Sequence, residues 1–184
     1  MMTREQAYQE LVKHVKNKNL IKHMIAVEAV MQGLADHFGE NRELWGLTGL
    51  LHDIDYDETK DTPELHSLKG AEMLQDLGLP EPVVQAVKVH NHFHDIPRTT
   101  LLDKALYAAD PVSGFLVAAA LVRPDKKLAS VELNYLRKKF GEKAFARGAD
   151  REQILTCEDL GLKLDEFLDL SLRYMQKAAA DLGL

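Results

Sequence analysis

The chain has 184 residues and a formal net charge of −6, with 23 Lys and Arg against 29 Asp and Glu. This length suits one domain, or one domain with an added helical segment. A composition of 46% hydrophobic and 28% charged residues is typical of a soluble globular protein and excludes a disordered one. The acidic balance argues against binding to a nucleic-acid polymer, which needs a positive field.

The sequence also predicts a cytoplasmic protein that makes no membrane contact. The single cysteine, Cys157, permits no internal disulfide, so a reducing compartment is the simplest assumption. The first residues lack the apolar core of a signal peptide. The longest uninterrupted apolar run, 115–122, is too short to cross a bilayer core of about 30 Å.

Hydrophobic periodicity predicts helices along nearly the whole chain and no strand, so the expected fold class is all-α. Thr3 and Gln6 indicate a capping box for a first helix that runs to about residue 16. Apolar residues at steps of three or four predict a second helix from residue 20 to Phe38, which Gly39 ends. Further helices are expected at 44–54, 64–77, 82–92, 101–122, 130–140, 150–161 and 164–182.

Alternatives stay open at Pro111 and at the domain boundary near residue 124. Pro111 lies inside the 101–122 helix and is expected to kink it or to start a second helix. Asp150 and Gln153 fit a capping box for the 150–161 helix. No flexible linker is evident, so the boundary near residue 124 is soft: residues 1–123 form one helical domain, and 124–184 form a C-terminal helical extension or part of the same domain.

The chemistry of the chain is concentrated in histidine and aspartate. His52 and Asp53 end a strongly apolar helix, where the turn of the chain allows neighbouring side chains to converge on one ion. An imidazole and a carboxylate together suit Mn, Fe, Co, Ni or Zn. The alternative is a surface histidine beside a solvated aspartate at a helix end.

Other residues of the same types strengthen the metal hypothesis. His23 lies on or beside the core face of its helix, and His66 and His90 lie near the ends of predicted helices. Asp110 lies among apolar residues, where an uncompensated carboxylate costs several kcal/mol, so it needs a partner. That partner is either a metal ion or the N-terminus of a helix beginning at Pro111.

The set His23, His52-Asp53 and Asp110 resembles the H…HD…D signature of the HD-domain metal-dependent phosphohydrolases, an all-helical superfamily. The stretch 50–55, LLHDID, looks like the central motif of that family, with Asp55 where many members have Gly. The resemblance spans about residues 20 to 118. The tail, including ALVRP and GADREQI, resembles a small group of bacterial and archaeal HD proteins described only as predicted hydrolases.

The resemblance implies an HD-domain helical bundle that holds one or two divalent transition-metal ions. His23, His52, Asp53 and Asp110 would surround the first ion, and Asp53 would bridge to a second ion held by the two additional histidines of two-metal members, which His66 and His90 resemble. Many of those members have consecutive histidines, whereas here Asn91 follows His90. The implied activity is hydrolysis of a small phosphorylated substrate, with a nucleotide among the candidates, by a metal-activated water.

Two other functions remain open on this ligand set. Di-iron oxygenases of the same superfamily use the same ligand types, and a degenerate HD fold can serve as a non-catalytic binding module. Metal analysis distinguishes these functions from a phosphohydrolase, whereas the sequence does not. The oligomeric state is likewise not predicted.

Cationic side chains could bind the phosphate of a substrate. Asp53 and Lys69 are the predicted catalytic residues, with Lys69 expected one helical turn after His66. Lys88 and Lys104 are further candidates. Residues 123–151 contain nine Lys and Arg against four Asp and Glu, which indicates either a solvated helix pair or a lip that attracts an anionic substrate.

Two neighbouring patterns have plainer interpretations. The acidic stretch 53–64 partly matches the calcium loop of an EF-hand, but Glu58 stands where the sharp turn needs Gly, so a solvated acidic turn is expected. His92 and His94 follow His90. On a continuing helix His94 would share a face with His90 at the mouth of the site, and in a loop both would be solvated.

Overall fold

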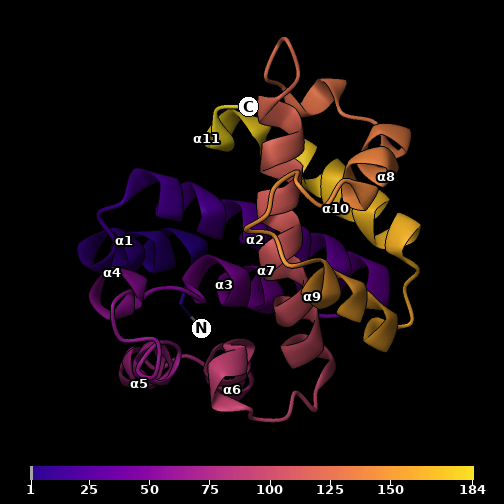
Figure 1. Cartoon of the computed structure of the whole chain (residues 1–184). Coiled ribbons are helices and arrows are strands. Elements are labelled where there is room, and N and C mark those ends of the chain that lie inside the picture. Colours follow the sequence, from indigo (N-terminus) through magenta and orange to yellow (C-terminus); the bar gives the residue numbers. More distant parts are fainter. Residues whose placement is uncertain (1) are drawn as a thin grey trace.

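The computed structural model describes residues 2–184, and over this range it contains helices and no strand (Figure 1). The predicted all-α fold class is confirmed. The α-helices are α1 (Arg4–His14), α2 (Lys18–Phe38), α3 (Arg42–Leu51), α4 (Tyr56–Thr59), α5 (Leu68–Asp76), α6 (Glu81–His90), α7 (Leu101–Leu121), α8 (Leu133–Gly141), α9 (Arg151–Leu155), α10 (Leu164–Lys177) and α11 (Ala179–Leu182). Three short 3₁₀ helices, η1 (His92–His94), η2 (Leu128–Ser130) and η3 (Thr156–Leu160), complete the set.

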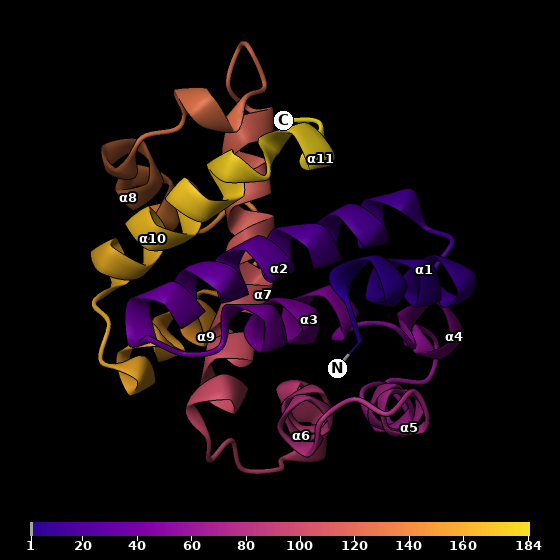
Figure 2. The ribbon, with the colours of Figure 1, turned by 180° about the vertical axis from the view of Figure 1, so that it is seen from behind.

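Helix α7 stands in the centre of the molecule, and the other helices are arranged around it (Figures 1 and 2). Helices α2 and α3 pack against each other and against α7, while α5 and α6 lie at one end of the molecule. The C-terminal helices α8 to α10 cover the other side of α7, and α10 also packs on α2 (Figure 2). This arrangement brings residues from α2, α3, α6 and α7 toward one point.

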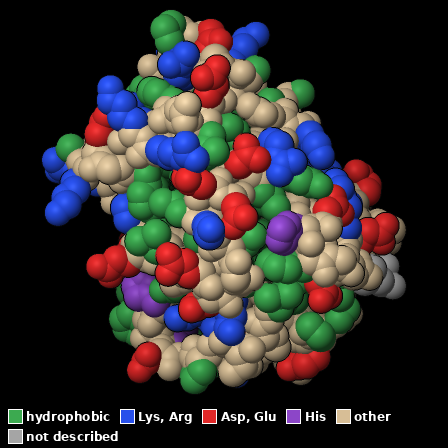
Figure 3. All heavy atoms as spheres, turned by 90° about the vertical axis from the view of Figure 1, so that its right-hand side faces the viewer, with side chains coloured by type: hydrophobic (Ala, Val, Ile, Leu, Met, Phe, Trp, Pro, Cys, Tyr) green, Lys and Arg blue, Asp and Glu red, His purple; other side chains and the backbone are tan. Residues whose placement is uncertain are grey.

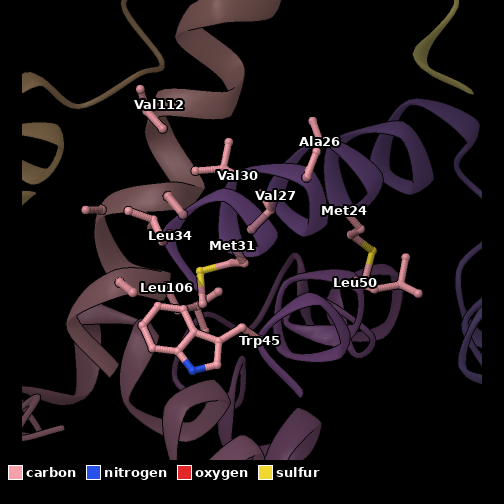
Figure 4. Packing of buried hydrophobic residues seen from close by; sticks show 14 of the residues in the cluster. Met24, Ala26, Val27, Val30, Met31, Leu34, Trp45, Leu50, Leu106 and Val112 are labelled. Atoms are coloured by element: carbon pink, nitrogen blue, oxygen red, sulfur yellow. The ribbon is translucent and has the colours of Figure 1, made fainter. Parts of the chain in front are cut away.

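The two long helices α2 and α7 each contribute more buried residues to the core than any other helix. Val30, Met31 and Leu34 are fully buried and lie beside Trp45 of α3 and Leu106 of α7 (Figure 4). Burial of such side chains stabilises the fold by about 1.5–3 kcal/mol each. One continuous cluster of buried hydrophobic residues runs from α1 to α11, so the C-terminal helices share this core. The expected boundary near residue 124 stays a prediction.

Helices α2 and α3 approach each other so closely that their backbones touch. A Cβ atom on Gly49 would lie 2.8 Å from the backbone nitrogen of Glu28, a distance that real Cβ atoms do not adopt. Glycine at this position therefore lets α3 lie directly on α2. His52 and Asp53 follow α3 at once, so the contact also fixes their position.

The predicted helix ends are largely confirmed. Thr3 and Gln6 form the expected capping box, in which each side chain accepts the backbone N–H of the other residue. Gly39 ends α2 with a φ of +70°, a conformation that glycine adopts without strain.

Pro111 does not interrupt α7, which is continuous from Leu101 to Leu121. The expected helix start at Pro111 is therefore wrong, and Asp110 is an interior helical residue that caps nothing. A proline cannot donate to the carbonyl four residues earlier, which here is that of Tyr107. The Gln153 side chain donates to this carbonyl instead, at 2.8 Å.

This use of Gln153 also changes its predicted role. The Asp150 side chain caps α9, as expected, by accepting the backbone N–H groups of Glu152 and Gln153. The reciprocal half of the capping box is absent from α9 because the Gln153 side chain is bonded to α7. The C-terminal segment thus completes the hydrogen bonding of the central helix.

The region between α3 and α5 differs most from the prediction. Residues 56–59 form the short helix α4 in a stretch expected to be irregular, and α5 begins at Leu68 rather than near residue 64. Turns precede α5, and Ser67 has a φ of +72°, which is rare for a residue with a side chain. His66 therefore lies in a turn, not on the helix.

Helix α7 is also long and apolar enough to cross a membrane by composition alone. More than half of its most apolar stretch is buried inside the protein, as expected of the core helix of a globular fold.

Candidate metal centre

The six predicted metal ligands come together at one point. Four of their locations adjoin helix ends: His52 and Asp53 directly follow α3, His66 precedes α5 and His90 ends α6. The other two, His23 and Asp110, lie within α2 and α7.

Asp53 lies at the centre of the cluster. Its Oδ1 atom is 3.4 Å from Nε2 of both His66 and His90 and 3.5 Å from Nε2 of His52. Its Oδ2 atom is 3.8 Å from Nε2 of His23. Asp110 closes the other side, with Oδ1 at 3.1 Å from Nε2 of His23 and 3.8 Å from Nε2 of His52.

These spacings suit ligands of a common ion. Two groups have all their ligand atoms within 4.8 Å of one another: His23, His52 and Asp110 form one, and His52, Asp53 and His90 form the other. Ligands about 2.1 Å from a tetrahedral ion lie about 3.4 Å apart, close to the shorter distances found here. His52 belongs to both groups, and Asp53 lies within 3.8 Å of the four histidines of the cluster, so the six side chains surround one site.

Each histidine is oriented by a hydrogen bond on the far side of its ring. The Nδ1–H groups of His52 and His90 donate to the carbonyls of Gly49, at 2.8 Å, and Val87, at 2.6 Å, each three residues earlier. His23 donates from Nδ1 to Ser113 Oγ at 3.2 Å, and the Ser113 hydroxyl donates in turn to the Asp110 carbonyl. These bonds leave the Nε2 lone pairs directed at the centre, which is the arrangement that metal-binding histidines need.

His66 is oriented by Asp55, a residue to which the sequence assigned no role beyond replacing a glycine of the family motif. The fully buried Asp55 accepts Nδ1–H of His66 on Oδ1 at 3.2 Å and the backbone N–H of Ser67 on Oδ2 at 2.9 Å. It therefore holds both the ring of His66 and the unusual backbone of Ser67. A Cβ atom on Gly70 would lie 3.0 Å from Oδ1, so glycine leaves room for this carboxylate.

Asn91 and His94 support His66 from the other side. Both donate to the His66 carbonyl, Asn91 from Nδ2 at 3.2 Å and His94 from Nε2 at 2.8 Å, and Asn91 also donates to the Pro63 carbonyl. Both alternatives predicted for His94 are therefore wrong: it does not lie on a continuation of α6, and its ring is bonded to the protein rather than solvated. These contacts could not be predicted from local patterns, because they depend on the turn that follows α6.

The ionisation states of these residues suit metal binding, which needs neutral imidazoles and ionised carboxylates. Burial lowers the pKa of His52, so its ring is neutral at pH 7. Burial opposes ionisation of Asp53, but the surrounding histidines outweigh it and hold the pKa of that carboxyl far below its usual range. Burial likewise opposes charge on His23 and His90, yet the carboxylates beside them raise the pKa of both rings. A bound cation would take the place of these protons.

The Nε2 atom of His52 indicates that the site fits a metal ion. The side chain of His52 is 0% exposed, and its Nε2 atom has no hydrogen-bond partner among the described residues. A buried polar atom without a partner costs about 1–3 kcal/mol, which a metal–nitrogen bond would remove. The donor set of imidazoles and carboxylates fits a divalent transition metal.

The predicted lysines lie outside this cluster. Lys69 forms an ion pair with Glu58 at an exposed position, so contact with a substrate would require this pair to break. Lys88 lines a surface cavity between α5 and α6 that contains none of the six ligands. The half-buried Lys104 forms no side-chain hydrogen bond or ion pair within the described part of the chain. The substrate-binding roles of all three stay predictions.

The acidic stretch does not assemble as a calcium loop. Asp53 lies in the metal centre, Asp55 lies behind His66 and accepts its Nδ1–H, and Asp57 accepts the backbone N–H groups of Lys16 and Asn17. The end of the stretch is an exposed turn, as expected for most of it.

Comparison with known proteins agrees with this site. The HD domain family matches residues 20–114, which contain all six candidate ligands, and the chain belongs to this family. Ribonuclease Y 2 of Levilactobacillus brevis is 30% identical over 122 residues, which is 65% of this chain and 21% of that protein. Ribonuclease Y of Lactobacillus acidophilus is 29% identical over 121 residues, 66% of this chain and 20% of that protein.

A third relative, ribonuclease Y of Dehalococcoides mccartyi, is 29% identical over 146 residues, or 73% of this chain and 26% of that protein. The chain thus spans about a fifth to a quarter of the length of the relatives it matches. Together, the family and the His/Asp cluster support a metal-dependent phosphohydrolase.

Proposed function

We propose that this protein hydrolyses a small phosphorylated substrate with one or two divalent metal ions held by His23, His52, Asp53, His66, His90 and Asp110. The observation that carries the proposal is the convergence of four Nε2 atoms on one buried carboxylate, with the Nε2 atom of His52 left without any other partner. Divalent ions at such a site lower the pKa of a water molecule and neutralise charge on a phosphate.

The protein's own groups have separate tasks in this proposal. Asp53, which lies within 3.8 Å of Nε2 of all four histidines, would be a ligand of each ion that binds. Four groups hold the imidazoles in the tautomer that binds metal: the Asp55 carboxylate, the carbonyls of Gly49 and Val87, and the Ser113 hydroxyl.

Exposure indicates where a substrate would enter. The side chains of His52 and His90 are 0% and 3% exposed, whereas those of His23 and Asp110 are 26% and 30% exposed. The centre is therefore closed at its inner end and open at the edge formed by α2 and α7. A phosphate group would approach across this edge.

The test is metal analysis of the purified protein combined with a hydrolysis screen over nucleotides, sugar phosphates and RNA. We expect bound Mn, Fe, Co, Ni or Zn and release of phosphate from a small ester. Asp53→Ala is expected to abolish both metal binding and turnover, while Asp61→Ala, an exposed aspartate in the following turn, leaves both unchanged. Hydrolysis retained by metal-free protein would overturn the proposal.

Other outcomes of this experiment favour the competing functions. Bound iron with consumption of O₂ and no hydrolysis would indicate an oxygenase. A folded protein that binds no metal at any concentration tested would indicate a binding module.

RNA is the second candidate substrate, because the relatives are named ribonuclease Y. The basic segment 123–151 does not add to this case. Arg137 and Lys139 are paired with Asp165 and Glu142, at 2.7 Å each, and Arg151 is bonded to backbone carbonyls. Lys and Arg are interspersed with Asp and Glu on the face that carries α8 to α10 (Figure 3), which favours a small anion over a polymer.

A further inference from the structure

Helix α7 has partly exposed residues along its whole length, and those from Asp110 onward form a stripe that starts beside the metal centre. In this stripe Asp110, Gly114, Val117 and Leu121 are not buried, and their spacing of three or four residues places them on one face. Leu121 is 50% exposed. Apart from Asp110 the stripe is apolar or small, so the central helix presents to solvent a path that leads away from the candidate ligands.

This stripe is the floor of a groove. Next to the ligands, a cavity of about 360 Å³ lies between the Asp110–Ala118 part of α7 and residues 146–149. Beyond it, a cavity of about 350 Å³ is lined by Val117, Leu121 and Leu182. His23 and Gly114 line both cavities, so the two meet over Gly114. The combined size is that of a small-molecule site.

The wall formed by residues 146–149 is held rigidly. Arg151 donates from its guanidinium to the carbonyls of Phe145, at 2.7 Å, Ala146, at 3.1 Å, and Ala149, at 2.8 Å. These bonds hold Ala146 at a φ of +46°, which is rare for alanine. Backbone strain kept in place by surrounding structure is typical of binding sites.

The polarity of the groove changes along its length. The metal end has His23 and Asp110, and in the adjoining wall no described acceptor bonds the backbone N–H groups of residues 146–148. The far end is lined mainly by aliphatic side chains, with Lys22 and Asn19 on its rim. A ligand that fits is charged or polar at one end and apolar at the other.

We propose that this groove binds the organic part of the substrate and selects phosphate esters whose organic group is apolar and at least as large as a phenyl ring. The inference rests on the proposed function, because the phosphate of such an ester would lie at the metal centre. Gly114 lies where the two cavities meet, and a Cβ atom there would meet nothing within 4 Å, so a longer side chain would project into the groove and fill it.

The test measures the binding of phosphonates, which are not hydrolysed, to the metal-loaded protein by calorimetry. We expect phenylphosphonate and hexylphosphonate to bind about 10-fold or more tightly than methylphosphonate, because their apolar groups leave water. Gly114→Leu is expected to remove this preference, whereas Gly114→Ala, its matched control, keeps it. Metal content is measured for every variant, so that the loss of an ion is not mistaken for the loss of the groove.

A second variant tests the far end without crowding the metal centre. Leu121→Ser replaces a half-exposed side chain and is expected to weaken hexylphosphonate by about 3-fold or more while methylphosphonate binds as before. Equal affinity of the wild type for all three phosphonates, or an unchanged preference in both Gly114→Leu and Leu121→Ser, would overturn the groove and leave the proposed function standing. If metal-loaded wild type binds no phosphonate and hydrolyses no ester, the proposed function fails, and this inference fails with it.

Discussion

The two parts of the chain bury very different side chains. Of the eleven described residues that are polar or charged and buried, ten lie before residue 124 and Ser171 lies after it. Burial of a polar group costs free energy unless a partner compensates it. Residues up to 123 therefore contain the candidate metal ligands and most of the buried polar groups, whereas the C-terminal helices supply apolar packing and hydrogen-bond donors such as Gln153.

This division predicts that substitutions in the two parts have different consequences. Changes in the C-terminal helices should lower the stability of the fold while the metal affinity of the folded protein stays the same. Changes among the buried polar residues should lower metal affinity first.

The largest effect is expected for Phe167→Ala in α10. Phe167 is fully buried, and removal of its ring leaves a cavity, so the free energy of unfolding should fall by about 3–5 kcal/mol. Guanidinium unfolding measures this loss, and metal titration of the folded variant should give the wild-type affinity. Phe93→Ala is the matched control, because Phe93 is 55% exposed. Weakened metal binding in the folded Phe167 variant would show that the C-terminal helices also determine metal affinity.

The next effect concerns Asp55. Asp55→Ala removes the acceptor of His66 Nδ1–H, so we expect metal affinity to fall about 10- to 100-fold. Calorimetric metal titration measures this loss, with the exposed Asp61→Ala as control. Unchanged metal affinity would mean that the carboxylate serves only the backbone of Ser67.

A smaller effect is expected where the two parts meet. Gln153→Leu leaves the Tyr107 carbonyl without a donor and should lower the free energy of unfolding by about 1–2 kcal/mol. The same change at exposed Gln75 should have no measurable effect. Equal stability of both variants in urea would show that water replaces the Gln153 amide and that α7 needs no donor from the C-terminal segment.

The smallest effect concerns Cys157, which is buried in the C-terminal part. Burial and the neighbouring acidic groups raise the pKa of its thiol to about 11. Ionisation begins only as the pH approaches that value, so at pH 8 the thiolate fraction is about 100-fold below that of a thiol with a pKa of 9. A thiol reagent should label the native protein far more slowly than the urea-unfolded protein, and equal rates would contradict this expectation.

Most of the helices could be predicted from local sequence patterns, and the six-residue cluster could be predicted from the resemblance to the HD-domain family. Periodic apolar residues define α2 and α7, and His52-Asp53 adjoins a recognisable helix end. The role of Asp55 could not be predicted, since it depends on the turn that brings His66 back beside it. The continuity of α7 through Pro111 depends on Gln153, which lies 46 residues from the carbonyl it bonds, and no local rule reports such a contact.

That contact also bears on how the protein is made. During synthesis α7 leaves the ribosome well before Gln153 does, and until then the Tyr107 carbonyl has no donor from the chain. Asp110, one of the candidate ligands, lies three residues after Tyr107 and directly before the proline. The four histidines can therefore come together early in synthesis. The hydrogen bonding of α7 beside Asp110 is completed only after the C-terminal segment has emerged and packed against this helix.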